Sequence, residues 1–289
     1  MVTPEAKRTV VRFWREGMGL SERRACSLIG LDRSTHRYQR RADRNSELRQ
    51  RLRELSEQRR RFGYRRLHVL LRRDGHAVNK KRIQRLYRQE GLSLRGRRRK
   101  KRYAGLRVLL PGPDAANQRW SMDFMTDALA DGRRFRLLNV VDDWTRECLA
   151  IEVGRSLTGR NVIAVLEKIA TQRSYPTAIV SDNGPEFCSR AVDEWAHRVG
   201  TRLQFIRPGK PVENAFIESF NGKCRDECLN ERLFLTIEQA RVATETWRLD
   251  YNQVRPHSAL GNLAPEDYAN RTRVGTPEPT KLRLSLVEK

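Results

Sequence analysis

The chain has 289 residues, a formal net charge of +24 and a sequence pI near 10.8. This length predicts two domains, and the large positive charge indicates a polyanionic partner, nucleic acid first among the candidates. There is no apolar run long enough for a membrane span and no signal-peptide pattern, so we expect a soluble, cytoplasmic protein. The five cysteines are scattered without paired CxxC spacing, which indicates neither a disulfide framework nor a zinc site.

The positive charge is confined to the first part of the chain. Residues 1–110 hold 34 Lys and Arg against 10 Asp and Glu, whereas the rest holds 25 of each kind. This asymmetry predicts a basic module that delivers a neutral enzyme to a polyanion. The alternative is a solubilising basic tail, but such a tail would not need the periodic apolar residues that this module carries.

Residues 46–94 predict three helices, with Gly75 ending the second at a tight turn and Asn79 capping the third. The apolar stripe of the third helix leaves its basic side chains on the outside: Lys80, Lys81, Arg82 and Arg85. This is the pattern of a DNA-binding helix-turn-helix domain. A plain three-helix bundle with a solvated arginine face is the alternative. Residues 1–45, where Ser21 is a helix N-cap candidate, form a second and weaker helix-turn-helix candidate.

Residues 95–117 are predicted to be a basic linker, because RGRRRKKR lacks apolar residues and PGPDAAN is rich in turn formers. The pattern then changes to short apolar segments typical of strands: RWSMDFM, GRRFRLLNVVDDW, ECLAIEV, TAIVSDNG and TRLQFI. Helices are predicted at residues 158–174, at SRAVDEWAHRVG and at VENAFIESFNGKCRDECLN. We therefore expect an α/β fold with a mixed five-stranded sheet over residues 118–272, followed by a tail at 273–289.

Three acidic residues occupy positions where open α/β sheets place their chemistry. Asp123 lies inside an apolar strand, Asp182 ends the fourth strand, and Glu218 stands on the last helix. Three carboxylates from separate elements, without His or Cys, suit the hard cations Mg²⁺ or Mn²⁺. Two such ions can serve phosphoryl transfer. Taken singly, each acid also has an ordinary interpretation, as a buried hydrogen-bonded acid, a turn former and a surface helix residue respectively.

Several motifs together closely resemble the DDE catalytic core of insertion-sequence transposases and retroviral integrases. They are RWSMDF, SDNGPEF and ENAFIESFNGKCRDE, with 35 residues between Asp182 and Glu218. Three further segments are similar to the OrfB-like product of the second reading frame in bacterial two-frame insertion elements: GRRFRLLNVVDDWTRECLAIEV, FIRPGKPVENAFIESFNG and YNQVRPHSALGNLAPEDYA. The resemblance runs over nearly the whole chain.

The resemblance implies a ribonuclease-H-like core in which Asp123, Asp182 and Glu218 bind two Mg²⁺ or Mn²⁺ ions when DNA is present. It implies a DNA transposase that cleaves element ends with activated water and joins the freed 3′-hydroxyls to target DNA. Four further residues are implied to lie close to DNA: Lys210, Asn214, Asn221 and Arg225.

The implied partners are double-stranded DNA, as terminal inverted repeats and target, and further copies of the chain in the DNA complex. An upstream-frame protein, or a frameshift fusion with it, is a further implied partner. The implied location is the bacterial cytoplasm, on the nucleoid when the protein is bound to DNA.

Two other functions stay open on the sequence. One is a ribonuclease-H-like nuclease that does not join strands, although such a nuclease does not need the basic N-terminal module. The other is a non-catalytic DNA-binding protein with a decayed core. Retention of all three acids at the family spacing argues against decay.

Overall fold

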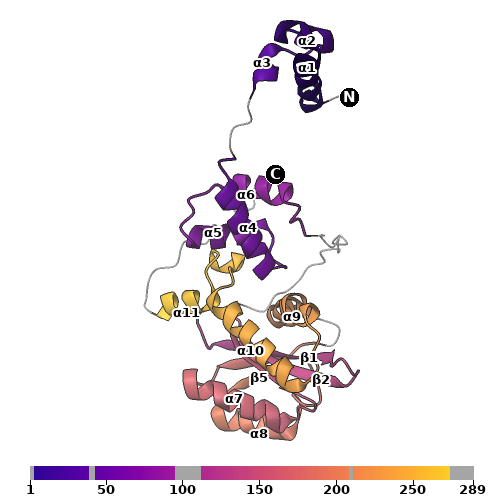
Figure 1. Cartoon of the computed structure of the whole chain (residues 1–289). Helices are drawn as coiled ribbons and strands as arrows, with labels where there is room; N and C mark the ends of the chain where they lie inside the picture. Colours follow the sequence, from indigo (N-terminus) through magenta and orange to yellow (C-terminus); the bar gives the residue numbers. More distant parts are fainter. Residues whose placement is uncertain (1–2, 39–42, 95–111, 208–210, 274–289) are drawn as a thin grey trace, which may run out of the picture. The chain divides into compact units, whose positions relative to one another are not determined.

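The computed structural model describes residues 3–38, 43–94, 112–207 and 211–273 (Figure 1). It divides into two compact units, residues 1–51 and residues 52–289, and the division falls inside helix α4 (Ser46–Gln58). The domain boundaries expected from the sequence stay a prediction. Most of the expected linker and nearly all of the expected tail lie outside the described residues.

The described part of the first unit holds α1 (Pro4–Met18), α2 (Glu22–Ile29) and α3 (Arg33–Arg37), followed by the start of α4. Ser21 begins α2 as a cap, because its hydroxyl accepts a hydrogen bond from the backbone N–H of Arg24 at 3.3 Å. A small hydrophobic cluster in this unit is formed by Val11, Ala25 and Cys26.

The three helices predicted over residues 46–94 are present as α4, α5 (Tyr64–Arg73) and α6 (Lys80–Gln89). The side chain of Asn79 accepts a hydrogen bond from the backbone N–H of Lys81 at 2.8 Å and so caps α6, as predicted. Gly75 turns the chain between α5 and α6 with a φ of 90°, a conformation that glycine adopts without strain. The predicted basic residues of α6 are exposed: Lys80, Lys81, Arg82 and Arg85.

The second unit contains a five-stranded mixed sheet in the order β3-β2-β1-β4-β5. Its strands are β1 (Arg119–Ala128), β2 (Arg134–Asp142), β3 (Cys148–Gly154), β4 (Ala178–Ser181) and β5 (Arg202–Phe205). The first three pair antiparallel, while β4 runs parallel to both β1 and β5. The crossover helices are α7 (Gly159–Arg173) and α8 (Arg190–Val199). The predicted mixed sheet is therefore confirmed.

The last part of the chain is mainly helical. After the short 3-10 turn η1 (Pro211–Asn214) come α9 (Ala215–Glu227), η2 (Leu229–Glu231), α10 (Ile237–Gln253), η3 (Ser258–Leu260) and α11 (Pro265–Arg273). The single long helix predicted over residues 212–230 is wrong at both ends. Asn214, with φ −113° and ψ 34°, leaves helical geometry, and its side-chain amide donates to the carbonyl of Met122 at 3.3 Å.

None of the helices in the described ranges is long and apolar enough to cross a membrane.

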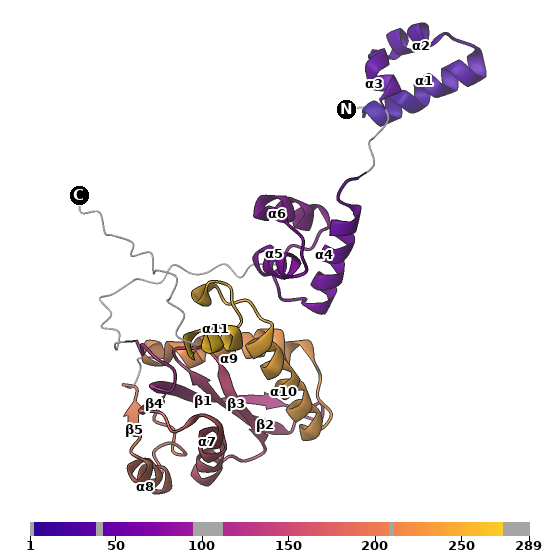
Figure 2. The ribbon, with the colours of Figure 1, turned by 90° about the vertical axis from the view of Figure 1, so that its left-hand side faces the viewer.

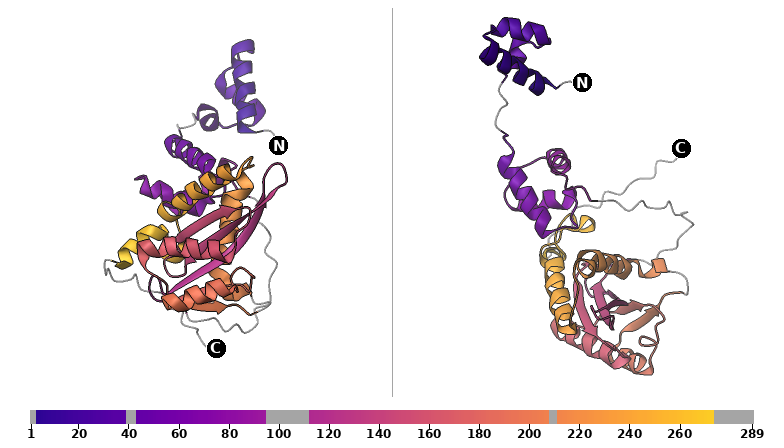
Figure 3. Two further views of the ribbon diagram at one scale, coloured as in Figure 1. Left: turned by 90° about the horizontal axis from the view of Figure 1, so that it is seen from below. Right: turned by 45° about the vertical axis from the view of Figure 1, so that its right-hand side comes forward.

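Helices cover both faces of the sheet (Figures 2 and 3). Trp120 and Met122 of β1 pack into the hydrophobic cluster formed with α7 and α8. Met125 of the same strand belongs to the cluster formed with α9 and α10. Because successive strand residues point to opposite faces, the odd-numbered residues of β1, Asp123 among them, face α9.

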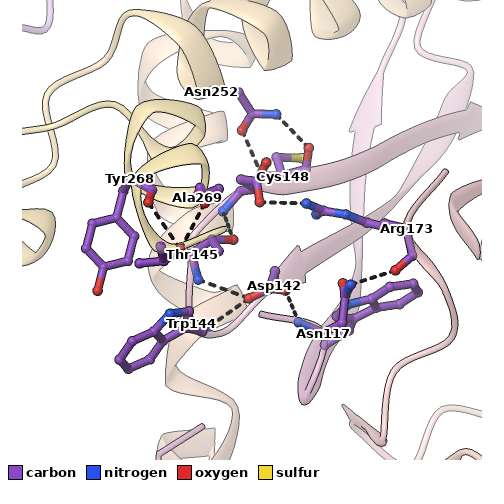
Figure 4. Close-up of polar contacts among 12 residues, drawn as sticks. Asn117, Asp142, Trp144, Thr145, Cys148, Arg173, Asn252, Tyr268 and Ala269 are labelled. Carbon is purple, nitrogen blue, oxygen red and sulfur yellow. Dashed lines mark hydrogen bonds and ion pairs between the residues drawn. The ribbon is translucent and has the colours of Figure 1, made fainter. Parts of the chain in front are cut away.

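The turn between β2 and β3 is held to its surroundings by a buried carboxylate (Figure 4). Asp142 accepts hydrogen bonds from the backbone N–H groups of Asn117, Trp144 and Thr145, at 2.8, 2.9 and 3.0 Å. Beyond the turn, Asn252 of α10 makes hydrogen bonds to both the N–H and the carbonyl of Cys148, at 2.8 and 2.9 Å. One amide side chain therefore fixes α10 to the first residue of the edge strand β3.

We predict that Asn252→Ala lowers the free energy of unfolding by about 2 kcal/mol, because it leaves the buried N–H of Cys148 without a partner. The carbonyl of Cys148 keeps a second donor, Arg248, at 3.1 Å. Urea titration measures the change. The control is Asn230→Ala, an exposed position in η2, where we expect a change of less than about 0.5 kcal/mol. Equal losses in the two variants would show that the tie to β3 is not what Asn252 contributes.

Candidate active site

Asp123 projects from β1 towards α9 and is only partly exposed. One carboxylate oxygen accepts the backbone N–H of Phe124 at 2.8 Å, and the other accepts the side-chain amide of Asn221 at 2.7 Å. Burial, together with the negative charges of Asp182 and Glu218, raises the pKa of Asp123 to about 6 against the opposing effect of the two hydrogen bonds. Asp182 and Glu218, both distant in sequence, therefore lie close enough to Asp123 to act on it.

Asp182 comes directly after β4, which lies beside β1 and runs parallel to it. Its side chain accepts the backbone N–H of Gly184 at 3.1 Å, which orients the carboxylate within its own turn. The neighbouring Asn183 ties this turn to the end of β5 by donating to the carbonyl of Ile206 at 3.0 Å.

The segment that follows Asp182 is also fixed to β1. Phe187 stacks on Phe124 with ring centroids 4.8 Å apart. Arg136 of β2 lies over the same Phe124 ring at 4.0 Å and forms an ion pair with Glu186. An aromatic stack, a cation–π contact and an ion pair thus hold the Asp182 loop against the strand that carries Asp123.

Glu218 lies in the first turn of α9 and is exposed. Its charge acts on Asp123, which faces the same helix. Within the described residues, however, no three His, Cys, Asp or Glu side chains already stand in an arrangement that could hold a metal ion. The three acids therefore lie in one region, but their side chains do not yet form a metal-coordinating arrangement.

A residue that the sequence analysis did not single out supports Asp123. Asn139 lies opposite Asp123 in the β1–β2 register and is fully buried. Its side-chain amide donates to the side-chain oxygen of Asn221 at 2.7 Å, and Asn221 in turn donates to Asp123. The signal in the sequence was a lone amide in the apolar strand FRLLNVVD.

The residues expected near DNA have different surroundings. Asn214 is buried, and Asn221 is bound to Asp123, so neither side chain is free in this conformation; their contact with DNA stays a prediction. Arg225 donates to the carbonyl of Thr126 at 2.9 Å at the edge of the site. Lys210 lies outside the described residues.

The chain matches known families along most of its length. An HTH-like domain matches residues 43–102, and integrase core domains match residues 113–211 and 199–265. The fold is also similar to a chain in the cryo-EM structure of the simian T-cell lymphotropic virus intasome in complex with PP2A regulatory subunit B56 gamma. There the TM-score is 0.50 and the identity 15%, with 80% of this chain and 78% of that chain covered.

Relatives in sequence come from bacterial insertion elements. A 31.7 kDa protein of insertion element IS407 from Burkholderia multivorans is 50% identical over 92% of this chain and 96% of its own length. The putative transposase InsK for insertion sequence element IS150 from Escherichia coli is 28% identical over 84% of this chain and 91% of its own length. The chain therefore belongs to the IS3-like family of insertion-element transposases, in which an HTH-like domain precedes an integrase core.

Proposed function

We propose that this chain is the polynucleotidyl transferase that moves its insertion element. It binds the terminal inverted repeats, cleaves the DNA there and joins the freed 3′-hydroxyl ends to target DNA. The observation that carries this proposal is the grouping of Asp182 and Glu218 near the partly buried Asp123, whose pKa burial and these two charges raise. A carboxylate with a pKa perturbed in this way is typical of a functional site.

Asp123, Asp182 and Glu218 are the residues that would hold divalent cations. A donor set made only of carboxylates suits Mg²⁺ or Mn²⁺. Asp123 is partly buried beside two like charges, an arrangement that a bound cation would stabilise. Bound in a pair, such ions supply charge stabilisation for phosphoryl transfer. We propose that DNA supplies the oxygen ligands that the three acids leave out.

Glu218 is favoured over Glu213 as the third acid, because the side chain of Glu213 is already bound to another residue. Glu213, in η1, accepts the guanidinium of Arg207 at 2.6 Å and the backbone N–H of the same residue at 2.9 Å. Glu218 is exposed on the helix that faces Asp123. Phe124 and Asn221 then have the role of orienting Asp123, with Asn139 holding Asn221 in place.

Sequence-specific DNA binding is assigned to the helix-turn-helix region. The exposed basic side chains of α6 stand opposite its buried apolar stripe, as in a recognition helix. Assembly of several copies on DNA belongs to the same proposal. A partner from an upstream reading frame stays a prediction from the resemblance alone.

Replacing any acid of the triad by its amide should abolish the reaction but not DNA binding. Glu218→Gln, Asp123→Asn and Asp182→Asn each remove a charge that a hard cation needs from its ligand. We expect cleavage and joining to fall by orders of magnitude while affinity for element ends stays near that of the wild type. A labelled element-end duplex with Mn²⁺ and a target plasmid reports cleaved and joined products.

The control is Asp226→Asn, an exposed acid on the same helix α9, which should join strands normally. Normal joining by all three triad variants would refute the transposase proposal. A wild-type protein that cleaves but never joins would favour the nuclease alternative.

Asn139→Leu should slow the reaction without touching a carboxylate. The variant keeps the branched shape and the number of heavy atoms of the side chain but removes the donor that orients Asn221, so Asp123 loses the support of its amide partner. Misplacement of a catalytic group can lower rates by about 10²-fold, and we expect a loss of roughly 10-fold or more. The unfolding temperature should not fall, because the side-chain oxygen of Asn139 is buried without a hydrogen-bond partner in the described part of the chain. Wild-type rates in this variant would remove Asn139 from the site.

Four glutamines in place of Lys80, Lys81, Arg82 and Arg85 should weaken binding to element ends. Each lost phosphate contact should also reduce the slope of log affinity against log salt by about 0.9. The matched control carries four glutamines at exposed cations of α7 and α8: Arg160, Lys168, Arg190 and Arg198. Anisotropy titrations of both proteins over a range of salt concentrations decide the matter. Equal losses would mean that net charge, not α6, drives binding.

A further inference from the structure

A group of cations lies on a side of α9 away from the acids. Lys223 follows Glu218 by five residues, which places it about 140° around the helix and roughly 7.5 Å along its axis. Its side chain is partly buried and makes no hydrogen bond or ion pair with any residue in the described ranges. Burial, and then the positive charges of Arg255, Arg66 and Arg146, lower its pKa to about 8, against the opposing effect of Glu227.

Arg146, in the turn between β2 and β3, is a further cation that makes no ion pair with a described residue. Its guanidinium lies 3.7 Å from the ring centroid of Phe216, which is also on α9. One of its terminal nitrogens, Nη1, is buried and has no hydrogen-bond partner among the residues that the structure describes. The two acids at the end of β2 and the start of this turn are already hydrogen-bonded to other groups. Asp142 accepts three backbone N–H groups, and Asp143 binds Arg119 and the hydroxyl of Ser121.

Glu227 is the carboxylate among the main charges that act on Lys223, and it is already bound by two guanidinium groups. Arg255, only 2% exposed, binds it through two nitrogens at 2.6 and 2.8 Å. Arg66 of α5, in the same compact unit, binds it at 2.8 Å. His257 adds no compensation, because burial and its cationic neighbours lower its pKa to about 2 and keep it neutral.

Three guanidinium groups, those of Arg255, Arg66 and Arg146, therefore act on the partly buried Lys223. The carboxylate that acts on it with them, Glu227, is already bound by Arg255 and Arg66. Charges withdrawn from water are normally paired and hydrogen-bonded. An oxyanion with several acceptor atoms would satisfy both Lys223 and the unpaired nitrogen of Arg146, since guanidinium groups recognise phosphate oxygens particularly well.

We propose that Lys223 and Arg146 form a binding site for the phosphodiester backbone of DNA, beside the carboxylate site on the same helix. The proposal rests on the proposed function, which brings DNA to α9. It adds a phosphate contact separate from α6 and from the three acids. Binding there would hold one strand of the substrate against the helix that carries Glu218.

A binding role and a purely structural role predict opposite effects on stability. A partly buried lysine among three guanidinium groups destabilises the folded protein when it is charged. Lys223→Gln should therefore raise the melting temperature in the absence of DNA, whereas loss of a structural contact would lower it.

The pKa of Lys223 also predicts how the stability of the folded protein changes with pH. Between pH 8 and 10.5 the unfolded chain binds more protons at this lysine than the folded chain, so wild-type stability should rise with pH across that window. The variant should lack this rise.

The direct test measures binding of a short duplex of arbitrary sequence by the full chain over a range of salt concentrations. Lys223→Gln should bind about 10-fold more weakly, with a salt slope smaller by about 0.9. Lys223→Arg keeps the charge and should restore most of the affinity. Lys168→Gln, at an exposed lysine of α7, should behave as wild type.

Acylation of lysines followed by mass spectrometry gives a second measurement that does not depend on catalysis. Lys223 should react readily at pH 8 in the free protein and be protected by the duplex, whereas Lys168 should react equally with and without DNA. Protection by inorganic phosphate alone, with no further protection by the duplex, would mean a site for free anions and would overturn the assignment to DNA.

Failure of this proposal differs from failure of the proposed function. If Lys223→Gln and Lys168→Gln bind the duplex equally and Lys223 is not protected, the phosphate site is refuted while the triad variants still report on strand joining. If all three triad variants join strands normally, the proposed function fails whatever Lys223 does.

Discussion

The alternation of side chains along β1 determines where the chemistry of this protein can take place. Trp120 and Met122 pack under α7 and α8, so Asp123 must face α9. Its partner on β2, Asn139, faces the same way and reaches Asn221. A shift of one residue would turn Asp123 towards α7 and α8 and bring Trp120 and Met122 to the side of α9. The packing of the core and the placement of the acid are therefore fixed by the same register.

Much of this could be predicted from the sequence, because the signals are local. The strands, the capped helix α6 and the candidate acids all depend on periodicity or on turn residues within a short window. The supporting contacts depend on pairs far apart in the chain. Asn139 meets Asn221 only after β2 and α9 have packed, and no local pattern records that meeting. The same holds for the start of α9, which depends on the bond between Asn214 and the carbonyl of Met122.

Helix α9 connects these features because its three faces have different partners. Ile217, Phe220 and Cys224 are buried in the hydrophobic cluster shared with α10. Asn221 and Arg225 reach β1, on the side from which Glu218 acts on Asp123. The third side carries Phe216, Lys223 and Glu227, the last of which binds Arg255. A helical repeat of 3.6 residues is what separates these sets, so the core, the acids and the cations are all fixed by the position of one helix.

Two side chains near α9, Asp123 and Lys223, are unfavourable in their charged forms, and their charges have opposite signs. Burial raises the pKa of Asp123 and lowers that of Lys223, so the folded protein disfavours the charged form of both. Conflicts between local stability and side-chain choice are typical of functional sites. A carboxylate in this position needs a cation, and an ammonium group needs an anion. In the proposed DNA complex a divalent ion would meet the first need and a phosphate of the DNA backbone the second, so substrate binding would relieve both unfavourable charges. Because a ligand that binds only the folded state stabilises it, the affinity for DNA and the stability of α9 would be parts of one equilibrium.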